Sequence, residues 1–174
     1  MSTPYPRALS LSHGVLRALV VANVLYGLGI LAMLVTSLVA AEFLFTALGV
    51  EPAEGVDRLV AGMRLIMVAG LAGVPLQHLV LVRLLAMVDT VRAGDPFVRE
   101  NAVRLQAIAW SVLGLELLHL VIGAIAGVSA SAAQPLDIDW SFSLTPWIAV
   151  LMLFVLARVF DQGTRMRADL EGTV

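Results

Sequence analysis

Glu116 and His119 are the residues whose types and spacing are best suited to chemistry in this chain, because both interrupt a long apolar run. Their i, i+3 spacing places the two side chains on one face of a helix. Another histidine, His78, follows Pro75 in a second apolar run and is expected at a similar depth. A carboxylate in hydrocarbon costs at least about 2.5 kcal/mol, so Glu116 is expected to be protonated, paired or in contact with water.

These three residues form a candidate intramembrane polar site that is compatible with several kinds of chemistry. His78, Glu116 and His119 could relay protons in a small transport protein, hold a divalent metal, or ligate haem through the two histidines. The Glu-x-x-His pattern occurs once, whereas di-metal carboxylate bundles use it twice with two further glutamates. A simple buried hydrogen bond between Glu116 and a histidine is the alternative. We therefore expect no cofactor and keep a metal or haem site as the weaker hypothesis.

No pattern typical of an enzyme is visible. The chain lacks cysteine, which excludes a thiol nucleophile, a disulfide and a thiolate metal site. It also shows no Ser-His-Asp set, phosphate-binding loop or paired catalytic carboxylates. The net charge of −2 is too small to indicate direct binding of nucleic acid. The expected class is a protein without catalytic activity.

Four long apolar runs must position these residues. They cover residues 18–41, 60–88, 105–128 and 144–160, and each is close to the roughly 20 residues that a helix needs to cross a bilayer. Hydrophobic residues make up 60% of the chain and charged residues 14%, a balance far from that of soluble domains. The sequence predicts an all-α membrane protein, with one transmembrane domain over residues 1–174 and four helices in an antiparallel up-down bundle.

The arginines predict the orientation of these helices. All eleven basic residues are arginine, and nine of them lie before the first run, around the connection 89–104, or at the end of the fourth run and in the tail 161–174. Arginine-rich loops stay on the cytoplasmic side of a membrane, so both termini are predicted to be cytoplasmic. Only Arg58 and Arg64 lie by the first connection. Arg64 is expected to reach the membrane interface by snorkelling.

The polar connection and the tail carry helix signals. Asp95-Pro96 offers an N-cap followed by the proline that favours a first helical position, which predicts a helix from Pro96 into the third run. The fourth helix is expected to continue past Phe160 as a short extension. Asp161 and Arg165 have the i, i+4 spacing of an ion pair on that extension.

Two segments outside the apolar runs resemble a known family. The connection GDPFVRENAVRLQAIAW (residues 94–110) and the tail VFDQGTRMRADLEGTV (residues 159–174) closely resemble the bacterial domain-of-unknown-function 2975 family. The tail departs slightly from the family pattern, with Gly172 between the acidic residue and Thr173. The resemblance implies a small four-span inner-membrane protein without an established activity. It also implies a gene that often adjoins one for a small helix-turn-helix regulator of the Cro type.

Both segments fall on the predicted cytoplasmic side, where they could form a surface for a partner. A conduit is expected to concentrate its unusual residues within the spans, whereas a tether presents them outside. The leading hypothesis is therefore a membrane regulatory partner or tether of a small helix-turn-helix regulator, and a homo-oligomer is left open. Attachment of Arg99 and Arg104 to anionic lipid is the competing interpretation. The candidate partner-binding residues are Asp95, Phe97, Arg99, Glu100, Asn101, Arg104, Arg165, Arg167 and Asp169.

Overall fold

The computed structural model describes residues 5–47, 56–129 and 143–171, and every regular element within these ranges is a helix. Four helices are long: α1 (Tyr5–Val39), α3 (Val56–Arg92), α4 (Arg99–Ser129) and α5 (Leu144–Glu171). The short helix α2 (Ala41–Ala47) follows α1. The predicted all-α class is therefore confirmed for the part of the chain that the structure describes.

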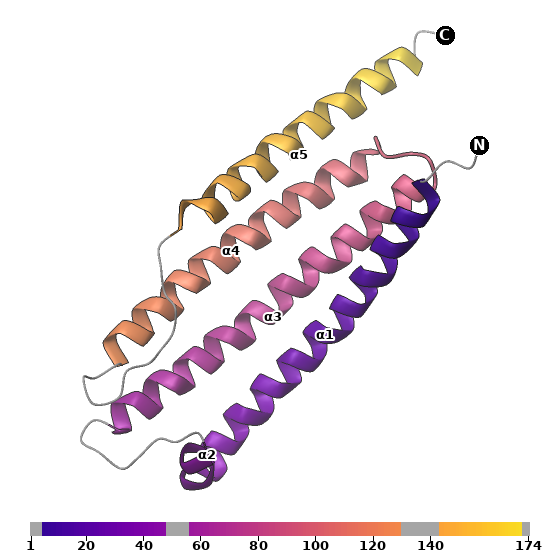
Figure 1. Cartoon of the computed structure of the whole chain (residues 1–174). Coiled ribbons are helices and arrows are strands. Elements are labelled where there is room, and N and C mark those ends of the chain that lie inside the picture. The colour runs from indigo at the N-terminus through magenta and orange to yellow at the C-terminus, as the bar shows by residue number, and fades with distance from the viewer. Residues whose placement is uncertain (1–4, 48–55, 130–142, 172–174) are drawn as a thin grey trace.

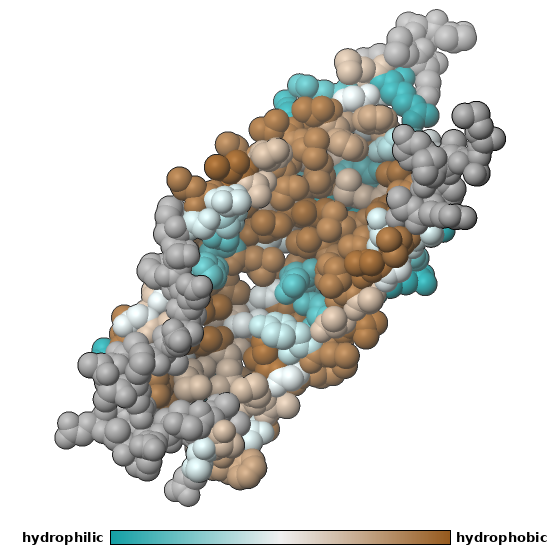
Figure 2. All heavy atoms as spheres, in the orientation of Figure 1, coloured by the Kyte–Doolittle hydropathy of each residue, from teal (hydrophilic) through white to brown (hydrophobic). Residues whose placement is uncertain are grey.

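Each long helix is long and apolar enough to cross a membrane. The candidate spans are Leu9–Val39, Asp57–Arg92, Arg99–Ser129 and Leu144–Arg167, and they correspond one by one to the four predicted runs. The visible face of the molecule is mostly hydrophobic along the helices (Figure 2). Hydrophilic side chains lie toward the end where α5 finishes, and smaller hydrophilic patches lie in the middle of the face (Figure 2). The structure thus agrees with the sequence in showing four candidate membrane-spanning helices.

The long helices lie side by side in one row, in the order α1, α3, α4, α5 (Figure 1). Each contacts only its neighbours in this order, and α1 and α5 do not touch within the described residues. Neighbouring long helices run in opposite directions, as the colours in Figure 1 show. The chain therefore passes from one edge of the row to the other.

The predicted up-down bundle of four helices is an open row in the described residues, because α1 and α5 are not in contact. Apolar side chains are exposed on both edge helices, for example Leu25 on α1 at 62% and Leu151 on α5 at 64%. In lipid, apolar surface gains little from contact with another helix instead of an acyl chain. No hydrophobic driving force therefore closes the row, and the lengths of the apolar runs carry no information about closure.

Polar contacts fix α1 against α3. Asn23 Nδ2 donates to the backbone oxygen of Val74 at 3.2 Å, next to Pro75, through which α3 continues. Near the C-terminal end of α1, Arg64 Nε of α3 donates to Ser37 Oγ at 2.9 Å. The structure places the Arg64 guanidinium against Ser37, close to the end of α1 at Val39.

Small residues let α3 and α4 approach closely. A Cβ added at Gly73 would lie 3.2 Å from Leu118 Cδ2, and one added at Gly62 would lie 2.0 Å from Ser129 Oγ. Such close approach through small residues is typical of helices in membranes. Gly62 and Ser129 lie near the beginning of α3 and at the end of α4, so the contact fixes the two helices at that end of the row.

Candidate functional site

One end of the row gathers most of the arginines. The beginning of α1, the end of α3, the beginning of α4 and the end of α5 lie there (Figure 1). Arg58 and Arg64 lie at the opposite end, in the first turns of α3. We call the end with most of the arginines the arginine-rich end. Its nine arginines are Arg7, Arg17, Arg83, Arg92, Arg99, Arg104, Arg158, Arg165 and Arg167.

Phe97 joins the connection between α3 and α4 to the end of α5. The ring centroids of Phe97 and Phe160 are 5.5 Å apart, with the planes tilted by 30°. Gly163 lies beside the same ring, and a Cβ at that position would be in ordinary van der Waals contact with Phe97 Cδ1, at 3.6 Å. Phe97 is nevertheless 49% exposed. It is therefore both a packing contact and an aromatic group available to a ligand.

A turn and an ion pair hold the same connection. Gly94 has a φ of 84°, the left-handed conformation that commonly ends a helix at glycine, and Asp95 N donates to the backbone oxygen of Thr90 at 3.1 Å. The Asp95 carboxylate then pairs with the Arg167 guanidinium of α5. This pair joins two segments that are far apart in the chain.

A second ion pair lies within α5 itself. Arg165 Nη2 is 2.9 Å from Asp161 Oδ2, which confirms the predicted i, i+4 pair. Arg158 Nη1 approaches the same carboxylate oxygen at 3.9 Å from the preceding turn. Asp161 therefore holds two guanidinium groups near one another on one face of α5.

These contacts surround an open pocket of about 610 Å³ at the arginine-rich end. Five of the predicted partner-binding residues line it. Glu100 is exposed beside the pocket without lining it, and the side chain of Asp169 lies outside the described residues. The lining residues are Asp95, Phe97, Arg99, Asp161, Thr164, Arg165 and Arg167.

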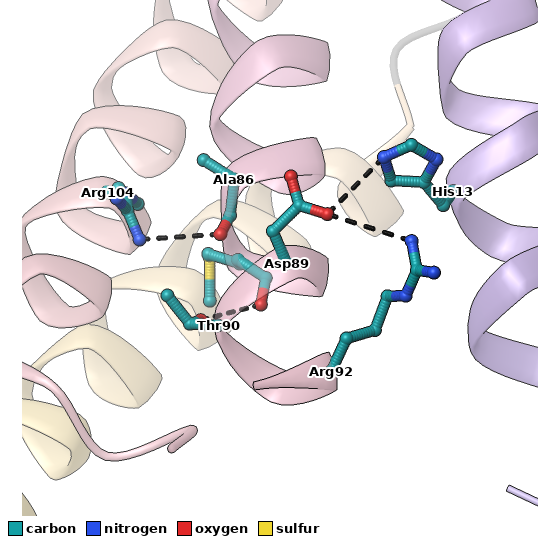
Figure 3. Close-up of polar contacts among 7 residues, drawn as sticks. His13, Ala86, Asp89, Thr90, Arg92 and Arg104 are labelled. Atoms are coloured by element: carbon teal, nitrogen blue, oxygen red, sulfur yellow. Dashed lines mark hydrogen bonds and ion pairs between the residues drawn. The ribbon is translucent and has the colours of Figure 1, made fainter. Parts of the chain in front are cut away.

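Asn101 and Arg104 turn inward instead. Asn101 is 1% exposed, and its Nδ2 donates to Thr90 Oγ1 at 2.7 Å and to the backbone oxygen of Pro96 at 2.9 Å. Arg104 Nη1 donates to Asn101 Oδ1 at 2.8 Å and to the backbone oxygen of Ala86 at 3.4 Å (Figure 3). These two side chains join α3 to α4, so we assign them to the fold and not to the partner surface.

The same contacts correct the predicted start of the third long helix. The sequence placed the start at Pro96 with Asp95 as its N-cap, whereas α4 begins at Arg99. The Asp95 carboxylate pairs with Arg167, and the Asn101 side chain binds the Pro96 oxygen. The distant contact of Asp95 and the local contact of Asn101 both favour a non-helical connection at residues that would otherwise suit a helix start.

Asp89 links α1 to this end of α3. His13 Nε2 lies 3.3 Å from Asp89 Oδ1, and Arg92 Nη1 lies 4.0 Å from the same oxygen (Figure 3). The His13 side chain is only 16% exposed. No pattern in the sequence pointed to this contact, because His13 precedes the first apolar run and its partner lies at the end of another helix.

The three residues of the predicted intramembrane polar site do not assemble into a metal site. The described part of the chain contains no group of three or more His, Cys, Asp or Glu side chains placed to hold a metal ion. His119 is exposed and Glu116 is half-buried on α4. His78 lines a separate open pocket of about 490 Å³ along α3, together with Pro75, Leu79, Val82 and Arg83.

Four apolar helices in a row, with a polar pocket at one end, define a multi-pass helical membrane protein. The chain belongs to DUF2975, a family described as a protein of unknown function, whose model matches residues 15–174. The match confirms the predicted family and includes both segments on which the resemblance was based. No curated protein and no solved structure matches the chain.

Proposed function

We propose that this protein is a membrane regulatory partner that binds a small helix-turn-helix regulator at its arginine-rich end, with both termini in the cytoplasm of a bacterium. The observation that carries the proposal is the meeting of the 94–104 connection and the end of α5 around one pocket. Phe97 and Arg167 belong to these two segments and both line that pocket. The segments that resemble the family most closely thus contribute to one surface.

The orientation is supported by the distribution of charge along the row. Nine arginines lie toward the arginine-rich end and two toward the opposite end. Arginines near the ends of spans favour the cytoplasmic side. A cytoplasmic partner would therefore meet the pocket, whereas the opposite end would face the periplasm.

The composition of the surface suits a protein partner. Aromatic residues and arginine are enriched in protein interfaces and supply most of their strong contacts. Here the half-exposed ring of Phe97 lines the same pocket as Arg99 and Arg167. The nearby carboxylate of Glu100 is exposed and adds a group of opposite charge for pairing across an interface.

The class of partner follows from the gene order that the family resemblance implies. A membrane protein that holds a DNA-binding protein needs no contact of its own with nucleic acid. Its effect would come from competition between membrane and DNA for the same regulator. The open pocket and its mixed charges allow such reversible binding, because a polar rim exchanges contacts with water easily.

Co-purification of the full-length protein in detergent with the regulator encoded beside its gene tests the proposal. Phe97→Ala should weaken the complex by roughly 30-fold, the effect of removing an aromatic hot spot of about 2 kcal/mol. Phe43→Ala is the matched control, because Phe43 is also an exposed aromatic residue, at 74%, but lies on α2 at the opposite end. The proposal fails if the wild-type protein does not bind the regulator, or if both variants weaken the complex equally.

A further inference from the structure

A second pocket lies between α4 and α5, deeper along the row than the partner surface. It has a volume of about 320 Å³. Arg99 of α4 lines it, together with Arg158 and Arg165 of α5. Arg158 and Arg165 are seven residues apart and therefore lie on one face of the helix, two turns from one another. Three guanidinium groups thus converge on one opening.

The charge of this pocket is unbalanced. Asp161 is the carboxylate among its lining residues, and its Oδ2 lies 2.9 Å from Arg165 and 3.9 Å from Arg158. It holds the two arginines in place but neutralises only one positive charge. The side chains of Arg158 and Arg165 remain 72% and 71% exposed. The pocket therefore presents an excess of positive charge to an anionic group, and guanidinium suits phosphate oxygens in particular.

The walls of the pocket become apolar away from the arginines. Val103 of α4 and Phe154 and Ala157 of α5 line its inner part, and Val103 is 54% exposed. Further along α4, the ring of Trp110 meets Phe154 edge to face, with centroids 5.1 Å apart. Trp110 is itself 59% exposed. An apolar strip therefore continues from the charged opening.

The length of this strip matches one leaflet of a membrane. Arg99, Val103, Gln106 and Trp110 follow one another at helical spacing on the same side of α4. The rise of about 1.5 Å per residue gives roughly 16 Å from Arg99 to Trp110, and half of the bilayer core measures about 15 Å. A free phosphate would use only the charged opening, whereas an amphiphile would use the whole strip.

From this geometry we infer that the groove between α4 and α5 binds an anionic phospholipid. The phosphodiester lies between Arg99, Arg158 and Arg165, and an acyl chain lies along Val103, Phe154 and Trp110. The inference goes beyond the proposed function, because its ligand is a lipid of the surrounding bilayer and not a cytoplasmic protein. Arg158 and the apolar strip belong to this groove, while Phe97 lines only the outer pocket.

Native mass spectrometry of the purified full-length protein tests the inference, with phosphatidylglycerol and phosphatidylcholine of equal chain length as probes. Phosphatidylglycerol should bind at least tenfold more tightly. Arg158→Gln should weaken its binding about fivefold, and Arg158→Gln with Arg165→Gln about 25-fold, since each basic residue near the membrane surface contributes about that factor. Phosphatidylcholine has the same phosphodiester, but its choline cation compensates the charge, so its binding should weaken less than that of phosphatidylglycerol in both variants. Trp110→Ala should weaken both lipids alike, because it removes only contact with the chain.

Arg92→Gln is the matched control, because Arg92 lies at the same end but outside the groove and pairs with Asp89. It should change phosphatidylglycerol binding less than twofold, as should Phe97→Ala, so this test and that of the protein partner can fail separately. Equal binding of the two lipids, or an equal loss in Arg92→Gln, overturns the inference. So does displacement of the lipid by inorganic phosphate at an equal concentration, which would indicate a site for a free anion.

Discussion

Asn101 Nδ2 donates to Thr90 Oγ1 at 2.7 Å, so one amide of α4 is held by a hydroxyl of α3. The same side chain accepts a hydrogen bond from Arg104 at 2.8 Å and is 1% exposed. Its removal takes one hydrogen-bond partner from Thr90 Oγ1, from the Arg104 guanidinium and from the Pro96 oxygen, and each such bond contributes about 0.5–1.5 kcal/mol, or more where a charged group takes part. The connection between α3 and α4 therefore depends on one asparagine.

Asn101→Ala should lower the free energy of unfolding by about 2–4 kcal/mol, as the sum of these effects. Thermal unfolding in detergent, followed by circular dichroism, measures the change. Gln162→Ala is the control, because Gln162 is an exposed amide on α5 and its loss should change stability by less than about 0.5 kcal/mol. Equal stability of Asn101→Ala and the wild type would contradict the structural role of Asn101.

Arg64 should stabilise the opposite end of the row through α1. Its Nε donates to Ser37 Oγ at 2.9 Å and its Nη2 to the Ser37 backbone oxygen, one of the carbonyls near the end of α1 that lack a partner within the helix. Arg64→Leu removes charge-assisted bonds that contribute about 1.5–3 kcal/mol. The melting temperature in detergent should fall accordingly, and Arg64→Lys should restore part of it. Arg58→Leu, at an exposed position one turn or more away, should have little effect; a similar loss there would show that any arginine at this end suffices.

The sequence was most informative where a feature is local. Apolar runs of sufficient length predicted the four spans, and i, i+4 spacing predicted the pair of Asp161 and Arg165. Each crossing of the membrane reverses the side on which the chain continues. The 94–104 connection and the tail are two crossings apart, so the sequence predicted that they lie at the same end. These features depend on neighbouring residues or on a simple count of crossings.

Features set by distant contacts were missed. The start of α4 depends on the pairing of Asp95 with Arg167, and the inward position of Arg104 depends on Ala86 of α3. Polar residues at a helix start look the same in the sequence whether they face a neighbour or solvent. The open row could not be predicted for another reason. An apolar helix face is about as stable against lipid as against a second helix, so the apolar pattern does not show which of the two it contacts.

Gly62 should be the glycine least tolerant of substitution at the contact of α3 and α4. A Cβ there would lie 2.0 Å from Ser129 Oγ and 2.3 Å from Ser129 Cβ, so α4 must move or its end must unwind. Gly62→Ala should destabilise the protein by about 1–3 kcal/mol, the usual cost of overpacking. Gly29→Ala is the matched control, since nothing lies within 4 Å of a Cβ at that helical position. It should stabilise the protein by about 0.5–1 kcal/mol, and the same sign for both variants would contradict the close approach.

The proposed orientation predicts which ends of the helices react with reagents added from outside. Because the chain contains no cysteine, a single introduced thiol reports one position without background. Ala93 follows α3 at the arginine-rich end and Ala47 ends α2 at the other, and both are exposed. In cells with a permeabilised outer membrane, a membrane-impermeant maleimide should label Ala47→Cys and leave Ala93→Cys unlabelled.

Labelling after solubilisation in detergent provides the control, because both thiols should then react to a similar extent. The expected difference in cells follows from the arginines, because nine lie toward one end and two toward the other, and arginine-rich loops are retained in the cytoplasm. Labelling of Ala93→Cys but not of Ala47→Cys would place the pocket around Phe97 in the periplasm. A cytoplasmic regulator could not reach it there, so this outcome would exclude the proposed partner while leaving the lipid groove between α4 and α5 in the other leaflet.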